Sequence, residues 1–110
     1  MILQQLKISP ETINFKEVIA FIDENYDFTP VRFVNGNMVN EVNQNNGSCK
    51  VFSFAKMNNL SKEKTLALFG DFYRIDVLEN PEGNDHQNIR NFMKYGWDGI
   101  SFSAEALKTK

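Results

Sequence analysis

Hydrophobic residues recur at helical spacing in several separate segments of the chain. In the first segment, Ser9-Pro10-Glu11 offers a capping serine, a proline suited to the first helical position and an acid in the first turn. We predict an amphipathic helix of about four turns from here to Tyr26 or Asp27, because Thr29 precedes a proline and is pushed out of the α region. Its apolar face comprises Phe15, Val18, Ile19 and Ile22. The apolar residues ahead of it, Leu3, Leu6 and Ile8, fit either a short helix or a strand.

A strand is predicted at Val31–Val34, where β-branched and aromatic residues are consecutive. The Asn35-Gly36 pair that follows is suited to a type I′ turn. The strand could pair with Met38-Val39 as a hairpin or with Ile100–Phe102 near the other end of the chain, and the pattern leaves both open. Asparagine occupies half of the positions from 35 to 46 and few of the others are apolar, so we predict a mobile loop there.

Two more helices are predicted in the middle of the chain. Ser48 is the expected cap of the first, a central helix with Lys50, Ser53 and Lys56 on its polar face. Its apolar positions are Val51, Phe52, Phe54, Ala55 and Met57. Ser61 starts the second helix, whose apolar stripe comprises Leu66, Phe69, Phe72, Tyr73 and Val77. Gly70 lies within this stripe and costs up to about 1 kcal/mol relative to alanine, so we expect a kink or a break there.

A further helix is predicted after the turn at 80–84, which has the sequence Asn-Pro-Glu-Gly-Asn. Asp85 is the expected cap of this helix, and Gly96 is the expected left-handed residue at its end, with Trp97 packing back. The residues predicted to face inward are Ile89, Phe92 and Met93.

The remaining residues complete the predicted fold class. Ile100–Phe102 is a short strand, Ser103 is expected to start a last turn through Leu107, and 108–110 are expected to fray. This order of helices and strands predicts an α+β fold over residues 1–110, mainly helical, with a small two- or three-stranded antiparallel sheet. With 42% hydrophobic and 24% charged residues, the composition is that of one folded domain rather than a disordered chain.

Charge and cysteine content narrow the classes of partner and compartment. Residues 1–55 carry four positive and six negative side chains and residues 56–110 carry eight of each, so neither half has the basic excess of a nucleic-acid-binding or membrane-binding protein. A single cysteine excludes an internal disulfide and suits a cytoplasmic protein. The start of the chain has no signal-peptide pattern, and no stretch is apolar enough to span a membrane. We expect a monomer.

Motifs for cofactors and metals are missing from the sequence. There is no phosphate-binding loop, no dinucleotide glycine fingerprint, no paired histidines at metal spacing and no nucleophile elbow. We therefore expect neither a cofactor nor a metal site. The many aromatic residues could line a pocket, but their helical spacing assigns them to the core.

The first candidate site is the start of the helix after the 80–84 turn. His86 and Arg90 are four residues apart and share one helix face near free backbone amides, so Asp85, His86 and Arg90 could bind a small anionic ligand or a protein partner. A structural role is the alternative. In it Asp85 caps the helix, His86 packs against the preceding turn, and Arg90 pairs with an acid such as Asp76 or Glu79.

The second candidate site is Cys49, in the first turn of the central helix. The helix dipole there can lower the pKa of a thiol and make it reactive. A nucleophile needs a base, and His86 is the single histidine of the chain. Cys49 and His86 are thus the candidate catalytic pair of a small enzyme, and the alternative is a buried structural cysteine.

Several sequence runs together resemble the HopJ type III effector protein family. They are Thr29-Pro30, Phe33–Gly36, Asn46–Phe52, Leu66–Gly70, Tyr73-Arg74, Asp76–Leu78, Asp85–Met93 and Gly96-Trp97, and they cover almost the whole chain. The resemblance implies a small bacterial protein and, by the family's name, delivery into a host cell through a type III secretion apparatus. It implies no enzymatic activity, cofactor or catalytic residue. Because of the cluster at the helix start, the favoured interpretation is a non-enzymatic binding or interaction protein that uses the surface around His86, Arg90 and the mobile asparagine-rich loop. The alternative is a small cysteine-dependent enzyme that uses Cys49 and His86.

Overall fold

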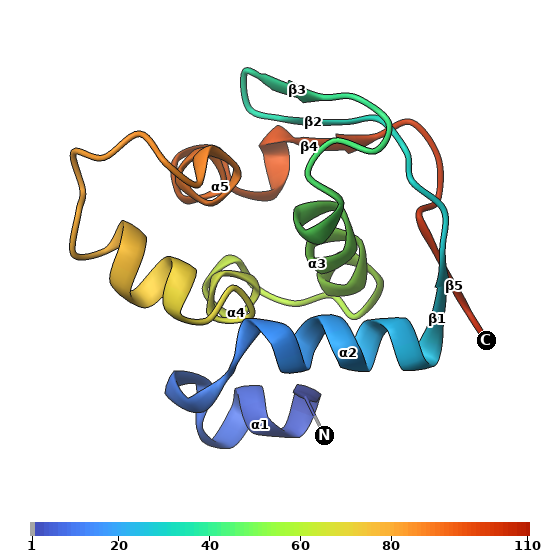
Figure 1. The fold of residues 1–110 in the computed structure, drawn as a ribbon, viewed down its shortest axis with the longest axis horizontal. Coiled ribbons are helices and arrows are strands. Elements are labelled where there is room, and N and C mark those ends of the chain that lie inside the picture. Colours follow the sequence, from blue (N-terminus) through green and yellow to red (C-terminus); the bar gives the residue numbers. More distant parts are fainter. Residues whose placement is uncertain (1) are drawn as a thin grey trace.

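The computed structural model describes residues 2–110 and has the predicted α+β class, with helices packed beside two small antiparallel sheets (Figure 1). The helices are α1 (Ile2–Ile8), α2 (Phe15–Asn25), α3 (Asn46–Met57), α4 (Lys62–Ala67) and α5 (Gln87–Tyr95). The 3-10 turns η1 (Pro10–Thr12) and η3 (Gly96–Gly99) and the π-helical segment η2 (Phe72–Val77) connect them. The strands are β1 (Tyr26–Phe28), β2 (Phe33–Asn35), β3 (Met38–Asn40), β4 (Ile100–Phe102) and β5 (Leu107–Thr109).

The three-stranded sheet contains both of the pairings considered for the strand at Val31–Val34, with Met38-Val39 and with Ile100–Phe102. Strand β2 lies between β3 and β4, with Val34 opposite Val39 on one side and opposite Ser101 on the other. The hairpin turn is Gly36-Asn37 rather than the predicted Asn35-Gly36, and only Gly36 has a positive φ, +64°, which is the pattern of a type II′ turn. Asn35 stays in the strand because its side chain is fully buried and bonded to α5.

The C-terminal segment corrects a second prediction. Residues 107–109 form β5, which pairs antiparallel with β1, whereas a helical turn and a frayed tail were expected. Leu107 is buried in the core, and its burial holds the strand against β1. The backbone N–H of Lys110 donates to the carbonyl oxygen of Asn25 over 3.1 Å, which extends the pairing to the last residue.

The N-terminal helical region is divided, whereas the pattern predicted one helix from Ser9. The apolar lead-in forms α1, Ser9 caps nothing with its side chain, and α2 begins only at Phe15. Ile13 is almost fully buried in an extended conformation, and this interrupts the helix. The side chain of Asn14 then accepts hydrogen bonds from the next backbone amides and caps α2.

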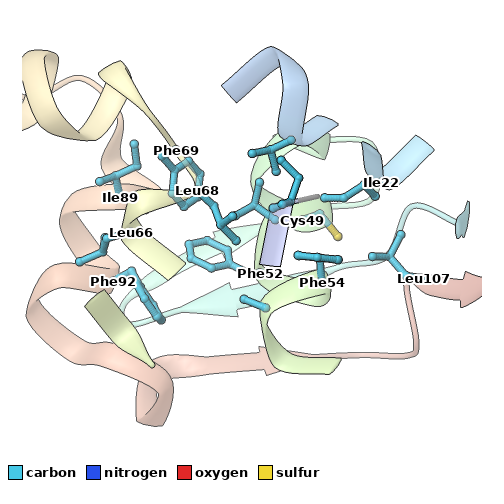
Figure 2. Packing of buried hydrophobic residues seen from close by; sticks show 14 of the residues in the cluster. Ile22, Cys49, Phe52, Phe54, Leu66, Leu68, Phe69, Ile89, Phe92 and Leu107 are labelled. Atoms are coloured by element: carbon cyan, nitrogen blue, oxygen red, sulfur yellow. The ribbon is translucent and has the colours of Figure 1, made fainter. Parts of the chain in front are cut away.

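Helix α3 is central, as predicted, and carries the core. Figure 2 shows Phe52 surrounded by labelled apolar side chains from α4, α5 and the segment after α4. The ring centroid of Phe52 lies 5.0 Å from that of Phe92 and 5.4 Å from that of Phe69. Ser53, predicted on the polar face of the helix, is buried.

The predicted cap and break in the next region are both present. The Ser61 hydroxyl oxygen accepts a hydrogen bond from the backbone N–H of Lys64 and caps α4. Gly70 has a φ of +61° and ends this helical stretch before η2. A Cβ at position 70 would lie 3.0 Å from the backbone nitrogen of Phe15, so glycine also permits the close approach of α2. No helix within residues 2–110 combines the length and apolar content that a membrane span needs.

Candidate functional site

The start of α5 differs from the predicted capped helix. Asp85 does not cap it: the helix begins at Gln87, and His86 occupies the position before it with a φ of +49°. The Asp85 carboxylate turns instead to Arg90, whose Nη2 lies 2.6 Å from Oδ1. The hydrogen bond from Arg90 lowers the pKa of Asp85 below its ordinary value. Asp85 therefore stays ionised to a lower pH than an ordinary aspartate does.

Arg90 fastens the preceding turn to α5. Besides the Asp85 carboxylate, its guanidinium donates to the carbonyl oxygens of Asp85, Asn80 and Pro81 at 2.6, 2.9 and 3.4 Å. Only 13% of the side chain is exposed. Arg90 pairs with an acid, as the structural alternative predicted, but the acid is Asp85 rather than Asp76 or Glu79. Most of the donors of Arg90 are thus engaged within the protein, which makes it a positioning residue for its neighbours.

His86 contacts η2 rather than the 80–84 turn against which it was expected to pack. Its Nε2 lies 3.0 Å from Oδ2 of Asp76 and 3.9 Å from Oδ2 of Asp85. The imidazole stacks on the Phe72 ring with a centroid distance of 4.9 Å and an interplanar angle of 30°. The left-handed backbone at His86 directs the side chain away from the axis of α5 and towards η2.

A cleft of about 320 Å³ adjoins His86 and lies between the starts of α3 and α5. Each of these helices begins after a residue in the left-handed region, Asn45 or His86, and neither residue caps its helix with its side chain. Backbone amides of both first turns therefore border the cleft without such a cap. The lining comprises Phe15, Met38, Asn45, Gly47, Ser48, Phe69, Phe72, His86, Gln87, Asn88 and Ile89.

A buried asparagine network supports one wall of the cleft, and the sequence reasoning missed it. Asn35 and Asn40, in the segment predicted as a mobile loop, are fully buried on the hairpin and contact Asn88 of α5. Asn88 Nδ2 in turn donates to Asn40 Oδ1 over 2.9 Å, and Asn45 Nδ2 donates to the same oxygen over 2.7 Å. The sequence contains one signal for this burial. Phe33 and Asn35 are two residues apart in a strand, so their side chains lie on the same face of it.

Cys49 and His86 are not joined by a hydrogen bond within residues 2–110. Cys49 lies in the core at 1% exposure, among the apolar side chains labelled in Figure 2. Burial raises the pKa of its thiol above the ordinary value, which outweighs the opposite effect of a hydrogen bond from the backbone of Val31. The polar neighbours of His86 are Asp76 and Asp85.

Three ligating side chains meet beside the cleft, although the sequence led us to expect no metal site. One atom each from Asp76, Asp85 and His86 lies within 4.8 Å of the others. The residues come from η2 and from the approach to α5, so their positions along the sequence form no recognised metal motif. Oxygen and imidazole ligands of this kind can hold a divalent cation.

A larger cleft, of about 770 Å³, opens between α3 and the C-terminal strands. Met57, Phe102 and Leu107 make much of its wall apolar, and Lys56, Glu105 and Lys108 stand at its borders. None of the residues selected from the sequence as site candidates lines it. Of these candidates, His86 lines the smaller cleft.

Comparison with known proteins identifies a family and a close structural match. The family model described as "HopJ type III effector protein" matches residues 1–107. The crystal structure of a protein of unknown function, VPA0580, shares 59% sequence identity and a TM-score of 0.97, and the match covers 98% of this chain and 90% of that one. The search of curated proteins finds no match.

Proposed function

The chain belongs to the HopJ type III effector protein family, and the resemblance to this family implied no catalytic residue. We propose that the protein is a non-enzymatic binding protein. Its ligand is a small anionic molecule held in the cleft between the starts of α3 and α5. The observation that carries this proposal is the convergence of two first helical turns, both without a side-chain cap at the preceding residue, on one cleft beside His86.

The chemistry of the cleft favours an anion with an apolar part. Backbone N–H groups at a helix start have no partner within the helix and carry the positive end of the helix dipole. Two such starts, at Gly47-Ser48 and Gln87-Asn88, border the same space. Phe15, Phe69 and Phe72 supply an aromatic wall against which a ring or an alkyl chain can pack.

The three residues selected from the sequence have different tasks in this proposal. His86 lines the cleft and contacts the ligand. Arg90 and Asp85 act indirectly, because their mutual ion pair fixes the turn that carries His86. An enzyme based on Cys49 is disfavoured, because the raised thiol pKa leaves little thiolate near neutral pH.

An NMR titration tests the proposal. The ¹⁵N-labelled protein is titrated with phosphate, a nucleotide and a dicarboxylate in a buffer that contains a chelator, with chloride at matched ionic strength as the reference. We expect shifts of the amides of Gly47, Ser48, Gln87 and Asn88 with at least one of these anions. If those amides stay unperturbed by every anion, the ligand proposal fails.

A charge variant sharpens the test. Ser48→Asp places a carboxylate at the cleft, where it repels an anion while suiting the first turn of a helix. We expect it to weaken binding by about tenfold or more. Ser103→Asp adds the same charge at an exposed position that does not line this cleft, and its affinity should match that of the parent protein. Equal weakening by both variants would mean that the anion responds only to net charge.

The place of action is a second part of the proposal. The single cysteine suits a reducing cytoplasm, and the name of the family denotes an effector delivered by a type III apparatus. We propose that the protein is bacterial and acts in the cytoplasm, including that of a host cell after delivery. A fusion to a reporter active only in host cytosol tests delivery. A signal that requires the secretion apparatus supports it, and a silent reporter overturns it.

A further inference from the structure

We propose that Asp76, Asp85 and His86 form a binding site for a divalent first-row transition-metal ion. The site lies beside the anion cleft, and the inference does not depend on the ligand proposed above. It contradicts the expectation from the sequence, which contained no recognised metal-binding motif.

The separations of the three ligand atoms suit one ion. Metal–ligand bonds of about 2.0–2.2 Å place neighbouring ligand atoms about 3.0–3.5 Å apart in octahedral or tetrahedral geometry. His86 Nε2 and Asp76 Oδ2 are already 3.0 Å apart. Asp85 Oδ2 lies 3.9 Å from the same nitrogen, and the three ligand atoms all lie within 4.8 Å of one another, so closure around one ion needs a shift of about 1–2 Å, within reach of side-chain rotations.

Groups around the cluster hold the ligands in place, as the surroundings of metal sites commonly do. Arg90 binds Oδ1 of Asp85 and leaves Oδ2 facing the imidazole. The Phe72 ring stacks on His86 and restricts rotation of the ring. Arg90 offsets one of the two carboxylate charges, and the other remains to attract a cation.

The donor set and its exposure select the class of ion. One imidazole nitrogen with two carboxylate oxygens suits Mn²⁺, Fe²⁺, Co²⁺ or Zn²⁺ better than the hard ions Ca²⁺ and Mg²⁺, which prefer oxygen alone. The side chains of His86, Asp76 and Asp85 are 28%, 44% and 57% exposed, so water can complete the coordination. Three protein ligands and open positions describe a site that can also accept an oxygen atom of a ligand.

Two titrations of the untagged, chelator-treated full chain test the site. Calorimetry with Zn²⁺ should show one equivalent bound with micromolar or tighter affinity. Addition of Mn²⁺ should broaden the NMR signals of the amides nearest Asp76, Asp85 and His86 before any others. If neither ion binds up to about millimolar concentration, or if the broadening centres elsewhere, the proposal is overturned.

Matched variants assign the ligands. Asp76→Asn keeps the size and an acceptor oxygen for His86, and His86→Asn retains a residue type that tolerates the left-handed backbone. Each should weaken Zn²⁺ binding by about tenfold or more. Glu79→Gln removes the same charge as Asp76→Asn at an exposed neighbouring position and should leave the affinity unchanged, as should Cys49→Ala. If both ligand variants retain full affinity, or Glu79→Gln weakens binding equally, the assignment is wrong.

The two proposals fail separately. The anion titration is performed with chelator present, so anion binding can be observed without a metal ion. Metal binding is measured without added anion. Loss of one signal with retention of the other therefore identifies which proposal is at fault.

Discussion

The replacement Asn88→Ala tests whether the buried asparagine network stabilises the fold. The side-chain oxygen of Asn88 accepts from Asn35 and Asn40 at 3.0 and 3.2 Å, and its nitrogen donates to Asn40 at 2.9 Å. After the replacement, Asn35 keeps its bond to the Asn88 carbonyl, and the Asn40 oxygen keeps its bond from Asn45. The Asn40 nitrogen retains only the Phe33 carbonyl oxygen at 3.5 Å.

The expected destabilisation follows from this inventory. One buried donor left almost without a partner costs about 1–3 kcal/mol, and the two other lost bonds cost about 0.5–1.5 kcal/mol each. The higher helix propensity of alanine returns only about 0.5 kcal/mol. We expect the free energy of unfolding to fall by between about 1.5 and 5.5 kcal/mol, a large part of the stability of a domain of this size.

Urea unfolding followed by the fluorescence of Trp97, the single tryptophan, measures this change. Asn84→Ala is the matched control, because Asn84 is exposed in the preceding turn. It should alter the free energy of unfolding by no more than about 0.5 kcal/mol. A loss below about 1 kcal/mol for Asn88→Ala would refute the view that these amides hold the hairpin to α5.

Three further predictions concern the core and one backbone position. Phe92→Ala should lower the free energy of unfolding by about 3–5 kcal/mol, because Phe92 is fully buried; a loss below about 1 kcal/mol in urea titrations would contradict this packing. Cys49 should react with iodoacetamide more slowly than a free thiol at every pH up to about 9, since its raised pKa reduces the thiolate fraction, and should react readily once unfolded; rapid labelling of the native protein would exclude the buried assignment. Gly70→Ala should cost at least about 1 kcal/mol, because position 70 has a positive φ and its new Cβ would lie 3.1 Å from the Ile13 carbonyl oxygen; an unchanged or raised melting temperature would contradict it.

Local signals in the sequence predicted the parts of the fold that depend on neighbouring residues. Ser61 caps α4, Gly70 breaks the helical stretch and Gly96 ends α5 with a positive φ, each for a reason visible within a few positions. The capping signal predicted the wrong residue at the start of α2, where both Ser9 and Asn14 were possible caps. Asn14 caps α2 although Ser9 precedes a proline, because the burial of Ile13 separates the two positions.

Long-range pairing explains most of what the sequence could not predict. Residues 107–109 have little strand character by themselves and become β5 only against β1. Asparagine favours turns in isolation, yet Asn35 and Asn40 are buried, because Asn88, from a helix distant in the sequence, accepts hydrogen bonds from their side-chain nitrogens.

The sequence predicted residues of the candidate site but not how they are arranged. The sequence selected Asp85, His86 and Arg90, and the structure brings all three together. The contribution of Asp76 depends on how η2 lies against the approach to α5, which no local pattern reports. No local pattern reports the distance between Cys49 and a base either.

Strand pairings between the first third of the chain and its end affect how the protein is made. Strand β1 pairs with β5, and the inner strand β2 pairs with β4. During synthesis, both early strands therefore have an unpaired edge until the residues of β4 and β5 have been made. Contacts between such distant positions slow folding, and open strand edges invite association with other chains. Newly synthesised molecules should therefore depend on chaperones late in translation, and removal of the last four residues should reduce soluble yield far more than their small number implies.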